Sequence, residues 1–90
     1  MPIRILLVDD HHVVRRGLAL LLNSETDIEV IGEATNGLEA VRLAQELSPD
    51  IIVMDLIMPI SNGIEATEQI LASTPDMRIL ILTSFSEQEY

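Results

Sequence analysis

Four apolar stretches recur along the chain and predict four β-strands. Three of them are short and almost continuously apolar, which is typical of strands buried on both faces. The remaining stretch, which is the second along the chain, alternates apolar with acidic positions. Ile28, Val30 and Gly32 share one face of it, and Glu33 lies on the other. This alternation favours a strand near a sheet edge. The predicted strands cover residues 3–8, 28–34, 51–54 and 79–82.

The interval after the first strand predicts an amphipathic helix over His12–Asn23. Apolar residues at a spacing of three and four form one face of this helix, which we expect to pack against the sheet. Arg15 and Arg16 fall on the other face and are expected to point to solvent. The expected inner residues are Val14, Leu18, Leu21 and Leu22.

Two further helices share one starting pattern, an asparagine followed three residues later by a glutamate. One begins at Asn36–Glu39 and ends before Pro49, and the other begins at Asn62–Glu65 and ends before Pro75. Strand and helix therefore alternate throughout. This order predicts the α/β class, with a parallel sheet between two layers of helix.

Composition narrows the functional classes. A chain of 90 residues suits one domain, and the absence of cysteine excludes disulfides and thiol catalysis. No apolar run approaches the roughly 20 residues that span a bilayer, so we expect a cytoplasmic protein without a membrane segment. The net charge is −10, from 15 acidic residues against five arginines and no lysine. Such a chain repels phosphate backbones, and we expect no direct binding of nucleic acid.

Acidic residues follow two of the predicted buried strands. Asp9 and Asp10 come directly after the first strand, and Asp55 comes directly after the third. If these strands are neighbours in a doubly wound sheet, the three carboxylates converge at the edge where open α/β sheets place their sites. Carboxylates at close range repel one another, and a divalent cation relieves the repulsion. With so few protein oxygens, Mg²⁺ that keeps several waters is favoured over Ca²⁺.

Simpler interpretations exist for several of these polar residues. An aspartate at a strand–helix junction is often an N-cap, and Asp10 could cap the helix that starts at His12. Thr83 could hydrogen-bond a group bound at Asp55, or it could be an ordinary β-branched strand residue. His11 and His12 invite a role in proton transfer or metal binding, but we expect neither to have one, and we expect His12 to face solvent.

Three motifs, in this order, resemble those of the receiver domain of bacterial two-component response regulators. The resemblance covers the whole chain and implies a flavodoxin-like receiver fold with strand order 2-1-3-4. The motifs are LVDDH at residues 7–11, VMDLIMP at 53–59 with Gly63, and LTS at 82–84.

The resemblance also implies a role for each residue at the acidic edge. Asp55 would be the phosphoacceptor, taking a phosphoryl group from a histidine kinase or a small phosphodonor. Asp10, Asp55 and the backbone carbonyl of Ile57 would hold Mg²⁺, and Asp9 would act through a bound water. Thr83 would contact the phosphoryl group and move with it. Such a domain is a regulatory phosphoacceptor and not a turnover enzyme.

Two further segments, VRRGL at residues 14–18 and TSF at 83–85, resemble the subfamily whose receivers precede a LuxR-like helix-turn-helix domain. The implied output is transcription regulation through a DNA-binding domain absent here. The family carries a lysine at the end of a fifth strand, whereas this chain has none. Residues 1–90 are therefore expected to be a partial receiver, without the fifth strand and last helices. The fourth strand would then be an exposed apolar edge, which favours self-association or element swapping.

Two other functions stay open on the sequence. A hydrolase of the haloacid dehalogenase type also uses a strand-end aspartate with Mg²⁺, but that family has Asp-x-Asp after its first strand, whereas this chain has Asp9-Asp10-His11. A phosphate-independent interaction or dimerisation module is the second alternative, which the absence of lysine favours.

Overall fold

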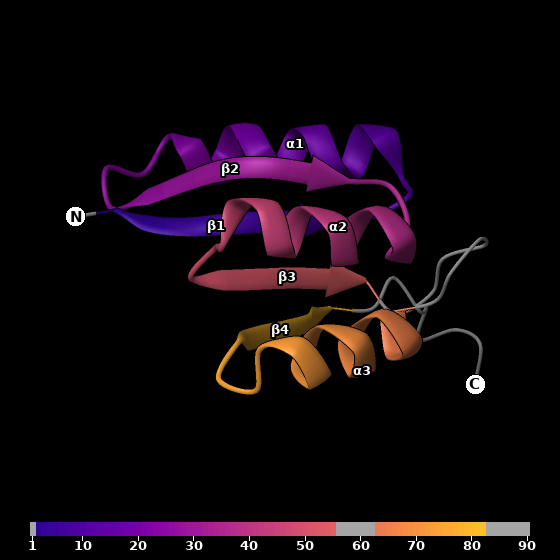
Figure 1. Ribbon diagram of the computed structural model, residues 1–90. Helices are drawn as coiled ribbons and strands as arrows, with labels where there is room; N and C mark the ends of the chain where they lie inside the picture. Colours follow the sequence, from indigo (N-terminus) through magenta and orange to yellow (C-terminus); the bar gives the residue numbers. More distant parts are fainter. Residues whose placement is uncertain (1, 56–62, 83–90) are drawn as a thin grey trace.

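The computed structural model describes residues 2–55 and 63–82, and its strands and helices alternate as the sequence predicts (Figure 1). All four predicted strands are confirmed, with one-residue extensions of the third and fourth. No helix within the described ranges is both long and apolar enough to cross a membrane. The elements are β1 (Ile3–Val8), α1 (His12–Asn23), β2 (Ile28–Ala34), α2 (Gly37–Leu47), β3 (Ile51–Asp55), α3 (Gly63–Ser73) and β4 (Arg78–Leu82).

The strands form one parallel sheet in the order β2-β1-β3-β4, which confirms the doubly wound, flavodoxin-like arrangement. β1 lies between β2 and β3, and its last residue, Val8, pairs with Ala34 on one side and with Met54 on the other. Since these strands run in the same direction, their carboxyl ends lie side by side at one edge of the sheet.

Helices cover both faces of the sheet, with α2 and α3 on one face and α1 on the other (Figure 1). The face under α2 and α3 is closely packed, because small helix residues let the helix backbones approach the strands. The α1 face has a smaller buried core. The first core contains Leu6, Val8, Ala34, Ala40, Ala44, Ile52, Met54, Ala66 and Ile70, and the second contains Ile5, Leu7, Ala19 and Val53.

A bulge in β2 changes which face its side chains occupy. Val30 and Gly32 pair with consecutive residues of β1, so Ile31 is an extra residue in β2. A shift of one residue reverses the facing of every side chain beyond it. The simple alternation predicted for this strand is therefore wrong past Ile31. Gly32 lies on the α2 face, close to a side chain of that helix, and Glu33 lies on the α1 face.

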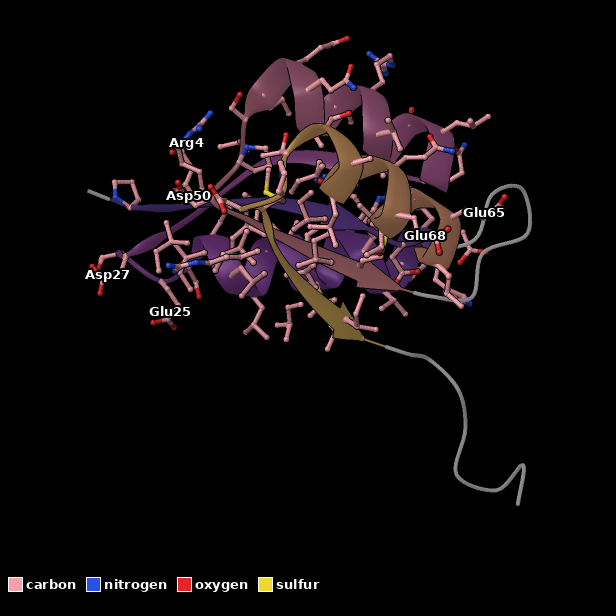
Figure 2. The ribbon with its side chains drawn as sticks, turned by 60° about the horizontal axis from the view of Figure 1, so that its bottom comes forward. Arg4, Glu25, Asp27, Asp50, Glu65 and Glu68 are labelled. Atoms are coloured by element: carbon pink, nitrogen blue, oxygen red, sulfur yellow. The ribbon has the colours of Figure 1, made fainter. Side chains whose placement is uncertain are left out.

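Arg4 closes the amino-terminal end of the sheet. Its backbone N–H donates to Oδ2 of Asp50 at 2.8 Å, and its guanidinium donates to the carbonyls of Leu47 and Ser48, each at 2.8 Å. Figure 2 shows Arg4 and Asp50 together at this end of the molecule. These bonds satisfy carbonyls at the end of α2 that no helical N–H can reach. Arg4 thus satisfies hydrogen-bonding groups of Asp50 and of the end of α2.

Candidate functional site

The turn between β1 and α1 is built by Asp9 and Asp10. The N–H of Asp9 donates to the carbonyl of Ala34 at 3.0 Å, and Oδ1 of Asp9 accepts from the N–H of His11 at 2.7 Å. The N-cap of α1 is His11, whose side chain makes no capping hydrogen bond. The interpretation of Asp10 as the helix cap is therefore wrong, because the chain turns into the helix one residue later.

Asp10 contributes an oxygen that the described residues leave unsatisfied. Its Oδ1 is buried and accepts no hydrogen bond from them. Nδ1 of His11 lies 3.2 Å from this atom, within ion-pair range but without hydrogen-bond geometry, and 2.8 Å from Oδ1 of Asp9. A buried carboxylate oxygen without a donor is unfavourable on its own. The arrangement indicates a place for an external cation.

Asp9, Asp10 and His11 together offer three possible ligand atoms that lie within 4.8 Å of one another. Two of these atoms are carboxylate oxygens, which are the ligands that Mg²⁺ and Mn²⁺ prefer. The third is an imidazole nitrogen, so the structure brings His11 into the cluster. The donor set and the unsatisfied oxygen of Asp10 fit a divalent cation.

Asp55 is the last residue of β3, and its backbone lies at the same edge of the sheet. The register of β1 with β3 pairs the residues immediately before Asp9 and Asp55. The fold thus brings the two neighbouring strand ends together, as the sequence predicts. Ile57 and Thr83 lie outside the described residues, as does the side chain of Asp55.

Arg15 is a buried charge beside the acidic turn, so the expectation that it faces solvent is wrong. Only 7% of its surface is exposed. Its Nε donates to Oε1 of Glu33 at 3.0 Å, its Nη1 donates to the carbonyl of Asp9 at 2.8 Å, and its Nη2 lies 3.2 Å from Nδ1 of His12. Arg16 pairs with the other oxygen of Glu33 and stays exposed. The β2 bulge explains this arrangement, because it turns Glu33 toward α1.

The contact with Glu33 also sets the rotation of α1. Leu18, Ala19 and Leu22 pack against the core under α1. Leu18 and Leu22 are four residues apart and were both predicted on this inner face. Val14 and Leu21 were expected on this inner face, but both are exposed. Two of the four predicted inner residues of α1 are therefore wrong, because the helix turns its Arg15 side inward.

Comparison with known proteins gives consistent matches over nearly the whole chain. Residues 5–90 match the family described as response regulator receiver domain. The transcriptional regulatory protein LiaR of Bacillus subtilis (strain 168) is 58% identical over 87 residues, which cover 97% of this chain and 41% of LiaR. The response regulator protein VraR of Staphylococcus aureus (strain Mu3 / ATCC 700698) is 48% identical over 89 residues, which cover 99% of this chain and 43% of VraR.

The solved structures agree with these matches. A two-component response regulator of the LuxR family from Aurantimonas sp. SI85-9A1 superposes with a TM-score of 0.89 at 44% identity, covering 96% of this chain and 61% of that one. The chain spans less than half the length of the two curated relatives, 41% of LiaR and 43% of VraR.

Proposed function

This chain belongs to the response regulator receiver domains, and we propose that Asp55 is its phosphoacceptor. The phosphoryl group comes from a sensor histidine kinase or from a small phosphodonor. The observation that supports this assignment most is the strand register, which places the backbone of Asp55 beside the acidic turn. Asp10 adds a buried oxygen to that edge which no described residue satisfies.

In this proposal, Asp10, Asp55 and the backbone carbonyl of Ile57 hold Mg²⁺, and Asp9 acts through a bound water. The ion, when bound, neutralises negative charge on the phosphoryl oxygens. The carboxylate of Asp55 attacks phosphorus in line. The new bond to phosphorus forms as the donor's bond breaks, and the leaving group takes the bonding electrons. Thr83 then hydrogen-bonds a phosphoryl oxygen and moves toward it, which converts a local charge change into a switch.

The proposed output is regulation of transcription by a DNA-binding domain outside residues 1–90, with this segment acting as the cytoplasmic receiver part. Two observations support it. The relatives carry the names of transcriptional and response regulators, and this chain matches only part of each. The net charge of −10 opposes direct contact with nucleic acid. The chain then serves as a phosphoacceptor and not as a turnover enzyme.

Incubation of the purified chain with Mg²⁺ and acetyl phosphate tests the assignment of Asp55. Intact-mass spectrometry should show one added phosphoryl group on the wild type and none on Asp55→Asn. Asp50→Asn is the matched control, because Asp50 is an aspartate at the opposite end of the sheet, paired with Arg4. It should be phosphorylated like the wild type. Equal labelling of Asp55→Asn, or no labelling of the wild type with excess donor, would contradict the proposal.

We also propose that the chain self-associates through the apolar surface on the α1 face of β4. Leu80 is 55% exposed and Leu21 of α1 is 66% exposed. The register pairs Leu80 with Val53, which belongs to the core under α1. Figure 1 shows α1 beside β1 and β2, with no described helix over β4 on that face. An apolar strand at a sheet edge pairs readily with another copy.

Light scattering over a range of protein concentrations tests this association. The mass of the wild type should rise toward a dimer or a larger species, and Leu80→Lys should shift the equilibrium toward the monomer. A wild type that stays monomeric at every concentration would refute self-association.

A further inference from the structure

Arg15 connects α1 and β2 to the acidic turn. It belongs to α1, it pairs with Glu33 on β2, and it donates to the carbonyl of Asp9 after β1. An arginine in the second turn of a helix points back toward the helix N-terminus, which explains how it reaches Asp9. Because the guanidinium is planar and rigid, its bond to Glu33 fixes the direction of its bond to Asp9.

Fixing the carbonyl of Asp9 also fixes the peptide plane that leads into Asp10. The carbonyl of one residue and the N–H of the next lie in a single planar peptide unit. The other side of Asp9 is held as well, because its N–H donates to the carbonyl of Ala34 at 3.0 Å. The backbone before Asp10 is therefore held on both sides, which fixes the position from which its side chain, with the buried Oδ1, extends.

We propose that Arg15 is the positioning residue of the cation site. Anchored by Glu33, it holds the turn so that the carboxylates of Asp9 and Asp10 converge on one divalent ion. Arg15 contacts neither the ion nor a reacting atom in this arrangement. The inference rests on the proposed function for the identity of the site, and it adds the residues that hold the site in shape.

Arg16 provides a control within the same molecule. It carries the same charge, follows Arg15 directly in α1 and pairs with the other carboxylate oxygen of Glu33 at 2.5 Å. Its side chain is 53% exposed, and among the described residues it makes no hydrogen bond to the turn. Loss of Arg16 removes one positive charge and one partner of Glu33 while leaving the bond to Asp9 in place.

Charge and position make opposite predictions for Arg15. A positive charge near the site repels a cation, so removing it should strengthen cation binding if charge alone matters. If Arg15 positions the turn, its removal should weaken binding, and so should Arg15→Lys, which keeps the charge but loses the planar fork. Substitution of a residue that hydrogen-bonds to a metal ligand and orients it typically lowers metal affinity by about 10-fold or more.

The test is a titration with Mn²⁺, which prefers the same oxygen ligands as Mg²⁺ and whose free concentration is read from its electron paramagnetic resonance signal. Mg²⁺ is added as a competitor to show that both ions share the site. The variants are Arg15→Met, Arg15→Lys, Glu33→Gln and Arg16→Met, each checked by circular dichroism to be folded at the titration temperature. We expect about 10-fold weaker binding for the first three and less than about a 2-fold change for Arg16→Met.

Unchanged or tighter binding by Arg15→Lys and Glu33→Gln would overturn the inference, and these two variants decide it if Arg15→Met does not fold. Absence of saturable Mn²⁺ binding to the wild type would overturn it too. Failure of the proposed function gives a different result. The wild type would then bind Mn²⁺ but gain no phosphoryl group from acetyl phosphate, and the order of the Mn²⁺ affinities would still judge Arg15.

Discussion

The two ends of the sheet use the same residue types with opposite results. At the amino-terminal end, Asp50 accepts the N–H of Arg4, and the guanidinium of Arg4 is used on the last carbonyls of α2. At the carboxyl-terminal end, Arg15 is equally occupied, yet Oδ1 of Asp10 is buried and accepts no hydrogen bond from the described residues. Within the described residues, the carboxylate at the amino-terminal end has a hydrogen-bond donor, whereas an oxygen of Asp10 at the carboxyl-terminal end has none.

This difference indicates that the amino-terminal end of the sheet contributes to stability and that the carboxyl-terminal end serves binding. The pairing of Arg4 with carbonyls serves the end of a helix and contributes to stability. The incomplete acidic edge costs stability, as groups kept for binding commonly do, and an external cation completes it. An aspartate after a strand is thus informative only together with its hydrogen-bond partners.

Neutralising Asp10 should produce the largest effect and should act in two directions. Asp10→Asn removes an anionic ligand, so Mn²⁺ affinity should fall by about 10- to 100-fold. It also removes the charge from a partly buried carboxylate whose Oδ1 has no donor among the described residues, so the free energy of unfolding in metal-free buffer should rise by about 1 kcal/mol. Mn²⁺ titration and urea unfolding measure the two effects. A variant that binds normally, or that is strongly destabilised without metal, would show that the oxygen has an internal partner.

Removing Arg4 should produce the complementary result at the other end. Arg4→Met loses two charge-assisted bonds to the carbonyls of α2, and the free energy of unfolding should fall by about 1 to 2 kcal/mol, with Mn²⁺ affinity unchanged. Arg42→Met is the matched control, because Arg42 forms an exposed pair with Glu46 and no other ion pair within the described residues. That pair should contribute no more than about 0.5 kcal/mol. Equal losses for the two variants in urea unfolding would remove the distinction drawn for Arg4.

The sequence predicted most of the fold because the buried strands are continuous apolar runs and the helices carry clear starting patterns. Asparagine at the start of α2 accepts from the N–H of Glu39, as the capping pattern predicts. The acidic edge was also predictable, since Asp9, Asp10 and Asp55 each lie at the carboxyl end of a strand whose neighbours the alternation of strands and helices indicates.

The buried environment of Arg15 could not be predicted, because it depends on one extra residue, Ile31, in β2. The bulge at Ile31 reverses the facing of Glu33, and the strand hints at a bulge only through the isolated glycine at position 32, which does not give the register on either side of it. Without it, Glu33 would point away from α1, and Arg15 would lose its carboxylate partner. The other signal was an acidic residue near the carboxyl end of a predicted strand. Its value depends on tertiary register, which periodicity within one strand does not contain.

We infer that a divalent cation binds at the carboxyl end of the sheet and not at the amino end. A titration of the ¹⁵N-labelled chain with Mg²⁺, followed by the backbone amide signals, tests this claim most directly. We expect saturable shifts at Asp9, Asp10, His11 and Asp55, with the amides of Arg4 and Asp50 unmoved. Shifts centred on Arg4 and Asp50, or no saturable shift at the acidic turn, would contradict it.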